Sequence, residues 1–400
     1  MTKRILIVGT GFAGMWSALS AARLFDLHSH TGTEIVVLAP QAELRIRPRF
    51  YEQDVHKMTA PLDALFDAVG VTFVKGAAER IDIAGKRIEY RDANGNPALL
   101  NYDRLVLATG SKVARPTLPG IERVFDVDEI ERAIRLEEHI KSLAQQPESA
   151  GRNTVVVAGG GFTGIEVATE MPARLRAVLG ADANVRVIVV DRGSKLGGAL
   201  GDNPSPLIAE ASEELGLEWR LNSTVASVDA DGIFLSNGER IFTKTVIWTA
   251  GVRASSLAEQ IPGERDAYGR LHVDANLKVI GQDDIFATGD VAYAATDDLG
   301  NYAAMSCQHA IALGRSAGNN VAASLIDVDP TAYSQPKYVT CIDLGGWGAA
   351  FTEGWDRQVR FVRDEAKKIK SEINSVWIYP PAADRATALA AADPSIPVVA

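Results

Sequence analysis

The chain has 400 residues, 46% hydrophobic and 23% charged, so it is long enough for two or three globular domains with ordinary cores. Its net charge of −10 argues against nucleic-acid binding, which normally requires a basic face, and gives no general attraction to anionic lipid. The two cysteines, Cys307 and Cys341, lie far apart and form no metal-binding or redox motif. We therefore expect a cytoplasmic protein with no disulfide framework and no metal site.

A glycine-rich turn follows the first predicted strand. Arg4 to Val8 is rich in β-branched residues and leads into Gly9-x-Gly11-x-x-Gly14, and Met15 to Leu24 is predicted to be a helix. In this spacing the first glycine permits a sharp turn, the second lets a pyrophosphate approach the backbone, and the third lets helix and strand pack closely. The helix N-terminus offers free N–H groups to phosphate. The segment therefore predicts a dinucleotide site.

The uncharged stretch from Ile5 to Ala22 could also be taken for a signal peptide or a membrane span. Three glycines at the spacing of a dinucleotide-binding motif, and a β-branched block that ends after five residues, favour a buried parallel strand instead. No other segment of the sequence is long and apolar enough to span a bilayer, so we expect a soluble protein.

The second predicted strand lacks the acid that usually binds ribose. Glu34 to Leu38 is followed by Ala39-Pro40, where an Asp or Glu is normally found. A backbone group or a side chain such as Gln41 or Glu43 must take its place. The next segment, RIRPRFYE, is basic and aromatic, and it is either a solvated loop or a contact to phosphate or flavin.

A second copy of the motif begins at residue 153. A strand runs into Gly159-x-Gly161-x-x-Gly164, and a helix follows. Here the ribose-binding acid is present, because the next strand ends at Asp191. A carboxylate at this place binds a ribose 2′-hydroxyl and repels a 2′-phosphate, while Arg192 beside it could reverse that preference. We expect NADH to be favoured, with NADPH as the alternative.

Three further strands end in short glycine-containing turns. The first ends at Thr109-Gly110, the second at Thr249-Ala250-Gly251 and the third at Gly289-Asp290. In an α/β sheet such strand ends meet the ligand. Alone, the last of these turns could be just an Asp at a helix N-terminus.

Five blocks, taken together in this order, resemble one group of flavoproteins: VGTGFAG, LVLATGS, AGGGFTGIE, VIWTAGV and DIFATGDVA. They are similar to the flavoproteins with two dinucleotide-binding domains in the pyridine nucleotide-disulfide oxidoreductase superfamily, and most similar to type II NADH dehydrogenases (NADH:quinone oxidoreductases). The resemblance covers about residues 4 to 320.

The resemblance implies an α/β fold with two Rossmann-like dinucleotide-binding domains, the NAD(P)H domain inserted in the FAD domain, plus a small C-terminal α+β region. The FAD-binding domain would comprise residues 1–115 and 253–330, the NAD(P)H-binding domain residues 116–252, and the C-terminal region residues 331–400. It also implies a ping-pong reaction in which NADH gives a hydride to flavin N5 and electrons then pass to an acceptor.

The resemblance assigns the cofactor contacts. For FAD they are Gly9, Gly11, Phe12, Ala13, Gly14, Arg47, Pro48, Ala78, Ala108, Thr109, Gly110, Gly289, Asp290 and Gln308. For NADH they are Gly161, Phe162, Thr163, Gly164, Glu166, Asp191, Arg192, Ala250 and Gly251.

Two residues are the catalytic candidates. Glu166 matches a family glutamate that faces the nicotinamide where it meets the flavin; the alternative is a carboxylate that only favours its own helix N-terminus. Glu170, one turn further on, is expected to be structural. Type II enzymes carry an A-Q-x-x-x-Q pattern beside the flavin, of which Gln308 is kept and Ala312 replaces the second glutamine. We expect either that Gln308 and His309 contact the flavin edge and the acceptor, or that they only cap and pack their helix.

The C-terminal part departs from the family. A helix is predicted at about residues 364–376, with apolar residues on one face, and we expect it to dock on the flavin domain rather than lie on a membrane. The Ala-rich tail to Ala400 is expected to be mobile or to serve in an interface.

We therefore expect an FAD-dependent NADH oxidoreductase with a quinone as acceptor. The alternatives are a soluble reductase that passes electrons to a carrier protein or another small molecule, and an NADH-sensing flavoprotein with slow turnover. Peripheral contact with the inner face of the membrane and a homodimer both stay open.

Overall fold

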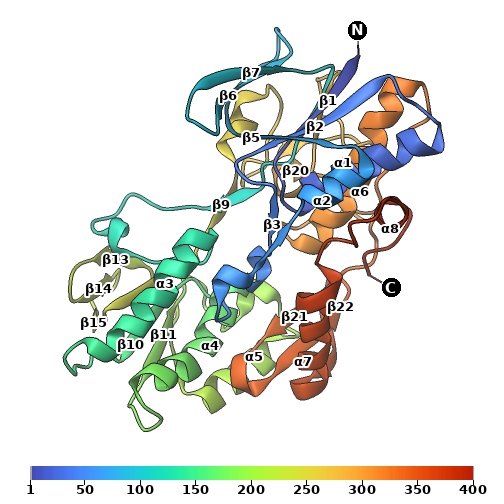
Figure 1. The fold of residues 1–400 in the computed structure, drawn as a ribbon. Helices are drawn as coiled ribbons and strands as arrows, with labels where there is room; N and C mark the ends of the chain where they lie inside the picture. Colours follow the sequence, from blue (N-terminus) through green and yellow to red (C-terminus); the bar gives the residue numbers. More distant parts are fainter. Residues whose placement is uncertain (1, 400) are drawn as a thin grey trace.

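The computed structural model describes residues 2–399, and two sheets form the centres of two lobes (Figure 1). In the first sheet, β1 lies in parallel register between β2 and β8, and its residues Ile5 to Ile7 are fully buried. β-Branched residues suit such a strand, because helices and loops cover both its faces. The strand order is β19 (Ile285–Ala287), β8 (Arg104–Leu107), β1 (Lys3–Val8), β2 (Thr33–Ala39), β5 (Thr72–Asp82), β6 (Arg87–Asp92) and β7 (Pro97–Asn101).

The first glycine turn joins β1 to α1 (Phe12–Leu27) by close backbone contact. A Cβ atom on Gly14 would lie 2.0 Å from the carbonyl oxygen of Gly9, and one on Gly9 would lie 2.3 Å from that of Ala108. Gly9 also has a positive φ of 114°, which side chains disfavour. The first and third glycines of the motif are therefore required by packing alone.

The second sheet has the order β12 (Leu217–Arg220), β11 (Arg186–Val190), β10 (Thr154–Ala158) and β16 (Thr245–Trp248), all parallel. α4 (Phe162–Leu179) follows its glycine turn, and α3 (Ile130–Ser142) and α5 (Ser205–Leu215) lie in the same lobe (Figure 1). A smaller antiparallel sheet covers its other side: β13 (Val225–Val228), β14 (Gly232–Leu235) and β15 (Arg240–Phe242).

The chain passes from the first sheet to the second and then returns. The outgoing strand β9 (Ser111–Val113) pairs with the returning strand β17 (Val252–Ala254), and β19 then adds to the first sheet beside β8. The second unit is thus inserted in the first, as predicted. Short pairs complete the first lobe: β3 (Glu43–Arg45) with β4 (Thr59–Pro61), and β18 (Leu271–His272) with β20 (Ala292–Tyr293).

Helix α6 (Cys307–Ile326) packs along α1 at very short range. Gly314 and Gly318 face α1, and a Cβ atom on Gly318 would lie 2.1 Å from the carbonyl oxygen of Ser17. The hydroxyl of Ser17 donates to the carbonyl oxygen of Gly314 at 3.1 Å. The N-terminus of α6 is thereby held beside the first glycine turn.

The C-terminal region is a small α+β unit, as predicted. It consists of β21 (Val339–Asp343), β22 (Ala349–Glu353), β23 (Gln358–Val362) and α7 (Arg363–Glu372). Its core joins that of the inserted unit, because Ile342 and Trp347 pack with Ile165 of α4 and Ile208 of α5. Helix α7 packs on β21 and β22 of its own unit through Ala366 and Ile369, so the expectation that it docks on the flavin domain is wrong in its main contact. Asn374, near the end of the predicted helix, does donate to Glu52 of the first lobe at 2.9 Å.

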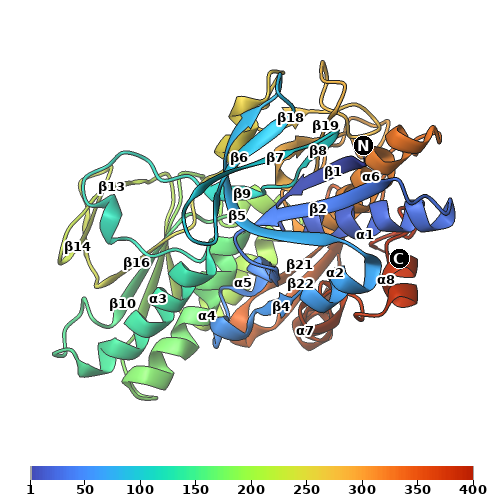
Figure 2. The same cartoon turned by 45° about the horizontal axis from the view of Figure 1, so that its top comes forward.

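The Ala-rich tail also differs from the expectation of a mobile segment. α8 (Arg385–Ala391) lies against α1 and α2 (Asp63–Val69) in the first lobe (Figure 2). Arg385 pairs with Asp26 at 2.7 Å, and Arg23 pairs with Asp393. Residue 400 lies outside the described residues. Among residues 2–399, none of the helices combines the length and apolar composition needed to cross a membrane.

The close contact between α1 and α6 predicts a strong effect of one methyl group. Gly318→Ala should lower the free energy of unfolding by about 1–3 kcal/mol, because the new Cβ atom has no room beside Ser17. Gly198→Ala is the matched control, since its Cβ atom would lie 3.4 Å from Lys195 Cβ, which is ordinary van der Waals contact. Urea denaturation measures both variants. Equal stability of the two variants would contradict the described packing.

Candidate active site

The first glycine turn leaves room for a phosphate. A Cβ atom on Gly11 or Gly110 would meet no atom within 4 Å, and no side chain caps the N-terminus of α1. The buried hydroxyl oxygen of Thr109 has no hydrogen-bond partner among the described residues. Free N–H groups at a helix N-terminus bind phosphate readily. These features fit the pyrophosphate of a dinucleotide.

Distant segments complete this turn. Gly289 lies against Ala13, since a Cβ atom on it would lie 2.7 Å from that of Ala13. Asp290 follows, and it accepts a hydrogen bond from the hydroxyl of Ser111 at 2.6 Å. Arg47 donates to the same hydroxyl at 2.9 Å and lies 3.6 Å from the Asp290 carboxylate. The structure thus brings Arg47 and Asp290 together with Ser111 as polar groups beside the first turn, and Gly289 provides the close packing there.

The second glycine turn is equally open. A Cβ atom on Gly161 would meet no atom within 4 Å, and α4 has no side-chain cap. Asp191 lies beside this turn, where its carboxylate accepts hydrogen bonds from the N–H groups of Gly160 and Gly193, each at 2.6 Å. Arg192 is exposed. A carboxylate held in this way retains lone pairs for a ribose hydroxyl.

The remaining candidates are spread along the same segments. Ala250 lies within contact distance of Gly159, whereas Ala78 lies in β5 beyond the part that pairs with β2. The other positions are half-buried Pro48 and Phe162, buried Phe12, Ala108 and Gly164, and exposed Thr163 and Gly251. Ala39 is buried at the end of β2, and Glu43, one of the two side chains suggested in its place, pairs with Arg45 at 2.9 Å.

Glu166, which begins the second turn of α4, forms a buried ion pair. Its Oε1 accepts hydrogen bonds from Lys370 Nζ at 2.7 Å and from the main-chain N–H of Asp343 at 3.1 Å. The side chains of Glu166 and Lys370 are only 5% and 7% exposed. The alternative that Glu166 serves only its own helix N-terminus does not account for a partner 204 residues away.

The protonation of this pair is set by burial and by neighbouring charges. Burial raises the pKa of Glu166 to about 7, although Lys370 opposes the shift, and Asp343 adds to it. For Lys370, burial lowers the pKa, but the adjacent Glu166 raises it above the usual value on balance. Glu166 can therefore gain or lose a proton near neutral pH.

The N-terminus of α6 presents Gln308 and His309 in different directions. Gln308 donates to the carbonyl oxygen of Val339 at 3.3 Å and accepts from Gln335 at 3.4 Å. His309 is fully buried between Tyr338 and the cap residue of the helix, and burial lowers its pKa to about 4. Gln308 is thus tied to the C-terminal segment, and His309 is neutral at physiological pH.

Cys307 and Cys341 are both free thiols. Burial raises the pKa of Cys307 to about 11 and that of Cys341 to about 12, so neither is a thiolate at neutral pH. This agrees with the prediction that they form no thiol relay.

Three polar residues of the site could not be singled out from the sequence. Lys370 belongs to a predicted amphipathic helix, where lysines are normally solvated, and Asp343 ends an apolar strand. Ser111 directly follows the strand end at Gly110 and was not distinguished from a turn residue. Because Ser111 directly follows a strand end, its position could have indicated a site residue. No local sequence pattern distinguishes Lys370 or Asp343 from ordinary residues of a helix or strand.

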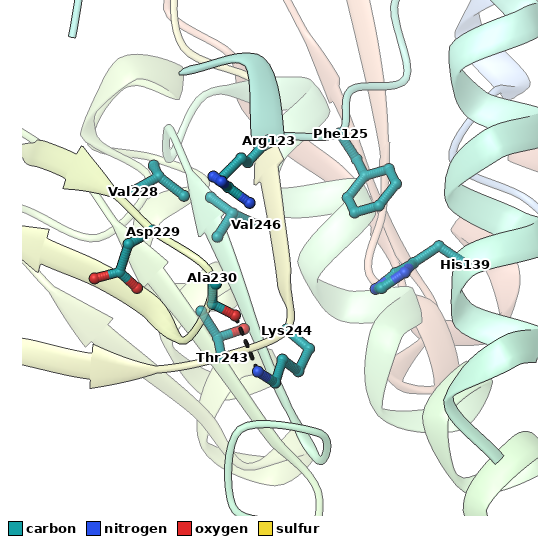
Figure 3. A pocket seen from close by; sticks show the side chains of 9 residues that line it. All are labelled: Arg123, Phe125, His139, Val228, Asp229, Ala230, Thr243, Lys244 and Val246. Carbon is teal, nitrogen blue, oxygen red and sulfur yellow. Dashed lines mark hydrogen bonds between the residues drawn. The ribbon is translucent and has the colours of Figure 1, made fainter. Parts of the chain in front are cut away.

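A cavity of about 240 Å³ lies elsewhere, towards the beginning of β16 (Figure 3). Phe125 and His139, which both line it, stack on each other with 4.4 Å between ring centroids. Lys244 donates to the carbonyl oxygen of Ala230 at 2.9 Å. The candidate residues lie around the glycine turns, which follow the ends of parallel strands, whereas this cavity lies towards the beginning of β16. None of the candidate residues therefore lines it.

The sequence matches the pyridine nucleotide-disulphide oxidoreductase family over residues 3–314. An NADH dehydrogenase-like protein of Mycobacterium tuberculosis is 43% identical over 98% of each chain. A demethylphylloquinone reductase of Synechocystis sp. is 29% identical over 72% of each chain. The solved structure of NDH2 from Plasmodium falciparum with NADH has a similar fold, with a TM-score of 0.76 at 15% identity, over 94% of this chain and 96% of that one.

The buried ion pair predicts a non-additive loss of stability. At pH 8, above the pKa of Glu166 of about 7, Glu166→Gln or Lys370→Met leaves one buried group without its charged partner. Each variant should lower the free energy of unfolding by about 3–5 kcal/mol.

The double variant should lose clearly less than the sum of the two single losses, because no buried charge is left alone in it. Denaturation of the four proteins by urea completes the cycle. Additive losses would mean that the two side chains do not interact.

Proposed function

Because the chain belongs to the pyridine nucleotide-disulphide oxidoreductase family, we propose that it is an FAD-dependent NADH oxidoreductase with a quinone as electron acceptor. One observation carries the proposal: two open glycine turns occur in one chain, and the buried ion pair of Glu166 with Lys370 lies on the helix that follows the second turn. The name of the relative from Synechocystis, a demethylphylloquinone reductase, supports a quinone as the acceptor class.

The first glycine turn is the proposed FAD site. Gly11 and the free N-terminus of α1 would hold the pyrophosphate, and Asp290 with Ser111 would bind the adjoining hydroxyl groups. Bound FAD would supply hydride acceptance and electron transfer, which no protein side chain can perform. The chain's own residues supply position, charge and the proton.

The second glycine turn is the proposed NADH site. Gly161 and the N-terminus of α4 would hold the nicotinamide dinucleotide by its pyrophosphate. Asp191 favours NADH over NADPH, because a carboxylate accepts a hydrogen bond from a ribose hydroxyl and repels a phosphate. Arg192 is exposed beside it, so NADPH stays as the weaker substrate.

Glu166 has two proposed tasks. From the second turn of α4 it orients the nicotinamide, and it holds a proton for the acceptor. Oxidation of NADH by a quinone takes up one proton from solvent, since the hydride carries one proton with two electrons and the quinol contains two. Glu166 can bind that proton because its pKa of about 7 lies near physiological pH, and Lys370 keeps the carboxylate paired after the proton has left.

The acceptor is proposed to bind near Gln308. Its amide is held by Val339 and Gln335 at the junction between α6 and the C-terminal unit. Ala312 stands where type II enzymes carry a second glutamine, which favours a less polar site or another acceptor. A carrier protein or another small molecule is therefore the second candidate, and it is decided by the experiment below.

Peripheral membrane contact is proposed for the short helical segment Ile373–Trp377, which follows α7. Its last two residues, Val376 and Trp377, are 65% and 56% exposed. Exposed Trp next to an apolar residue is typical of segments that lie at a membrane surface.

The proposal predicts the behaviour of the flavin in two separate half-reactions. Anaerobic NADH should bleach the flavin absorbance of the purified holoprotein in a stopped-flow instrument, and NADPH should do so at least tenfold more slowly because of Asp191. A short-chain quinone should then restore the absorbance rapidly.

Glu166→Gln is the matched variant, because it keeps the size of the side chain and removes its charge. It should slow bleaching by NADH while flavin stays bound. Rapid reoxidation by a carrier protein but not by quinones would favour the second candidate. Slow reoxidation by every acceptor would favour an NADH sensor, and no bleaching by either nucleotide would overturn the proposal.

A further inference from the structure

Two layers of charge lie between α4 and α7. Glu166 and Glu170 are one turn apart on α4, and Lys370 and Lys367 are one turn apart on α7. The inner pair, Glu166 with Lys370, is buried, whereas Lys367 lies 3.9 Å from Glu170 with side chains 39% and 22% exposed. Glu170 therefore belongs to the outer layer, which fits the structural role expected for it.

Asp343 connects the two layers. Its buried carboxylate accepts hydrogen bonds from Lys367 Nζ, from the N–H of Gly345 at 2.9 Å and from the hydroxyl of Tyr51 at 3.2 Å. Its main-chain N–H donates to Glu166 Oε1 at 3.1 Å. The negative charge of Asp343 thus stands next to Glu166, and Lys367 neutralises it from the solvent side.

We propose that Asp343 and Lys367 are positioning residues that set how readily Glu166 takes up and releases its proton. The proposal rests on the proposed function, in which that proton serves the acceptor. Asp343 and Lys367 act through space and need not contact NADH or the acceptor. Buried charges act on each other strongly because little water screens them.

Other titratable groups face this cluster from each element packed around it, and they stay unchanged in the test below. They are Lys370 of α7, Glu170 of α4, Cys341 of β21, Cys307 of α6, and Tyr51 and Glu52 of the segment after β3.

The sign of the effect follows from the charges. Without Lys367, the charge of Asp343 is no longer neutralised, so Glu166 should hold its proton to higher pH. Without the charge of Asp343, Glu166 should lose its proton at lower pH. A charge within a few ångströms shifts a carboxyl pKa by about 1 unit or more, which is a tenfold change in the ratio of protonated to ionised Glu166.

Infrared titration of the purified holoprotein tests the proposal without turnover. The carbonyl band of protonated Glu166 is identified by its loss in Glu166→Gln. Its midpoint in the wild type should lie near the pKa of about 7. It should rise by about 1 pH unit in Lys367→Met and fall by a similar amount in Asp343→Asn.

Lys368→Met is the matched control, because Lys368 lies next in α7 with the same charge and is exposed to solvent. It should leave the midpoint unchanged. An unchanged midpoint in Lys367→Met, or an equal shift in Lys368→Met, would overturn the proposal. Because Lys367 is partly exposed, Lys367→Met should fold, and it tests the proposal even if Asp343→Asn does not fold.

Reoxidation kinetics provide the second readout. After reduction, the pH at which a short-chain quinone reoxidises the protein at half its maximal rate should move with the infrared midpoint. Ferricyanide takes up electrons and no proton, so its rate should be the same in the wild type and in Lys367→Met. A shift in the infrared midpoint with no reduction by NADH would contradict the proposed function and leave the role of Asp343 and Lys367 in place.

Discussion

The ion pair between Glu166 and Lys370 determines how the parts of the site are held together. A single charge in this position would be costly, because both side chains are almost completely removed from water. The pair requires α7 to lie against the N-terminal half of α4, and this contact depends on the core shared by Ile342, Trp347 and Ile165. The C-terminal unit is therefore part of the proposed active site as well as of the fold.

The two glycine turns impose the complementary constraint. In each turn the first and third glycines allow backbone atoms to approach within distances that a Cβ atom would not permit, and the second faces open space. The packing positions and the phosphate position are thus different residues of one motif. In the first turn, Gly289 against Ala13 brings Asp290 into place, which explains how a segment from the returning chain completes the first unit.

The parts of the fold that could be predicted from sequence are those with local signals. Gly9, Gly11 and Gly14 mark a strand, a turn and a helix within a dozen residues, and the repeat at Gly159 marks the second unit. The α/β fold, the insertion of one unit in the other and the family followed from such blocks. Their order along the chain was as informative as their content.

The parts that could not be predicted depend on long-range contacts. Lys370 meets Glu166 across 204 residues, and its helix carries lysines on several faces, so no local pattern distinguishes it. The docking of α7 was misjudged for the same reason, because amphipathicity shows which face is buried and not against what.

The central claim is that the two dinucleotide sites meet at Glu166. A crystal structure of the holoprotein with NADH tests it most directly. The account predicts that the nicotinamide lies within about 3.5 Å of the flavin ring, at the distance needed for hydride transfer, with the Glu166 carboxyl beside its carboxamide. A nicotinamide bound away from Glu166, or a flavin bound at a segment other than the first glycine turn, would contradict the account.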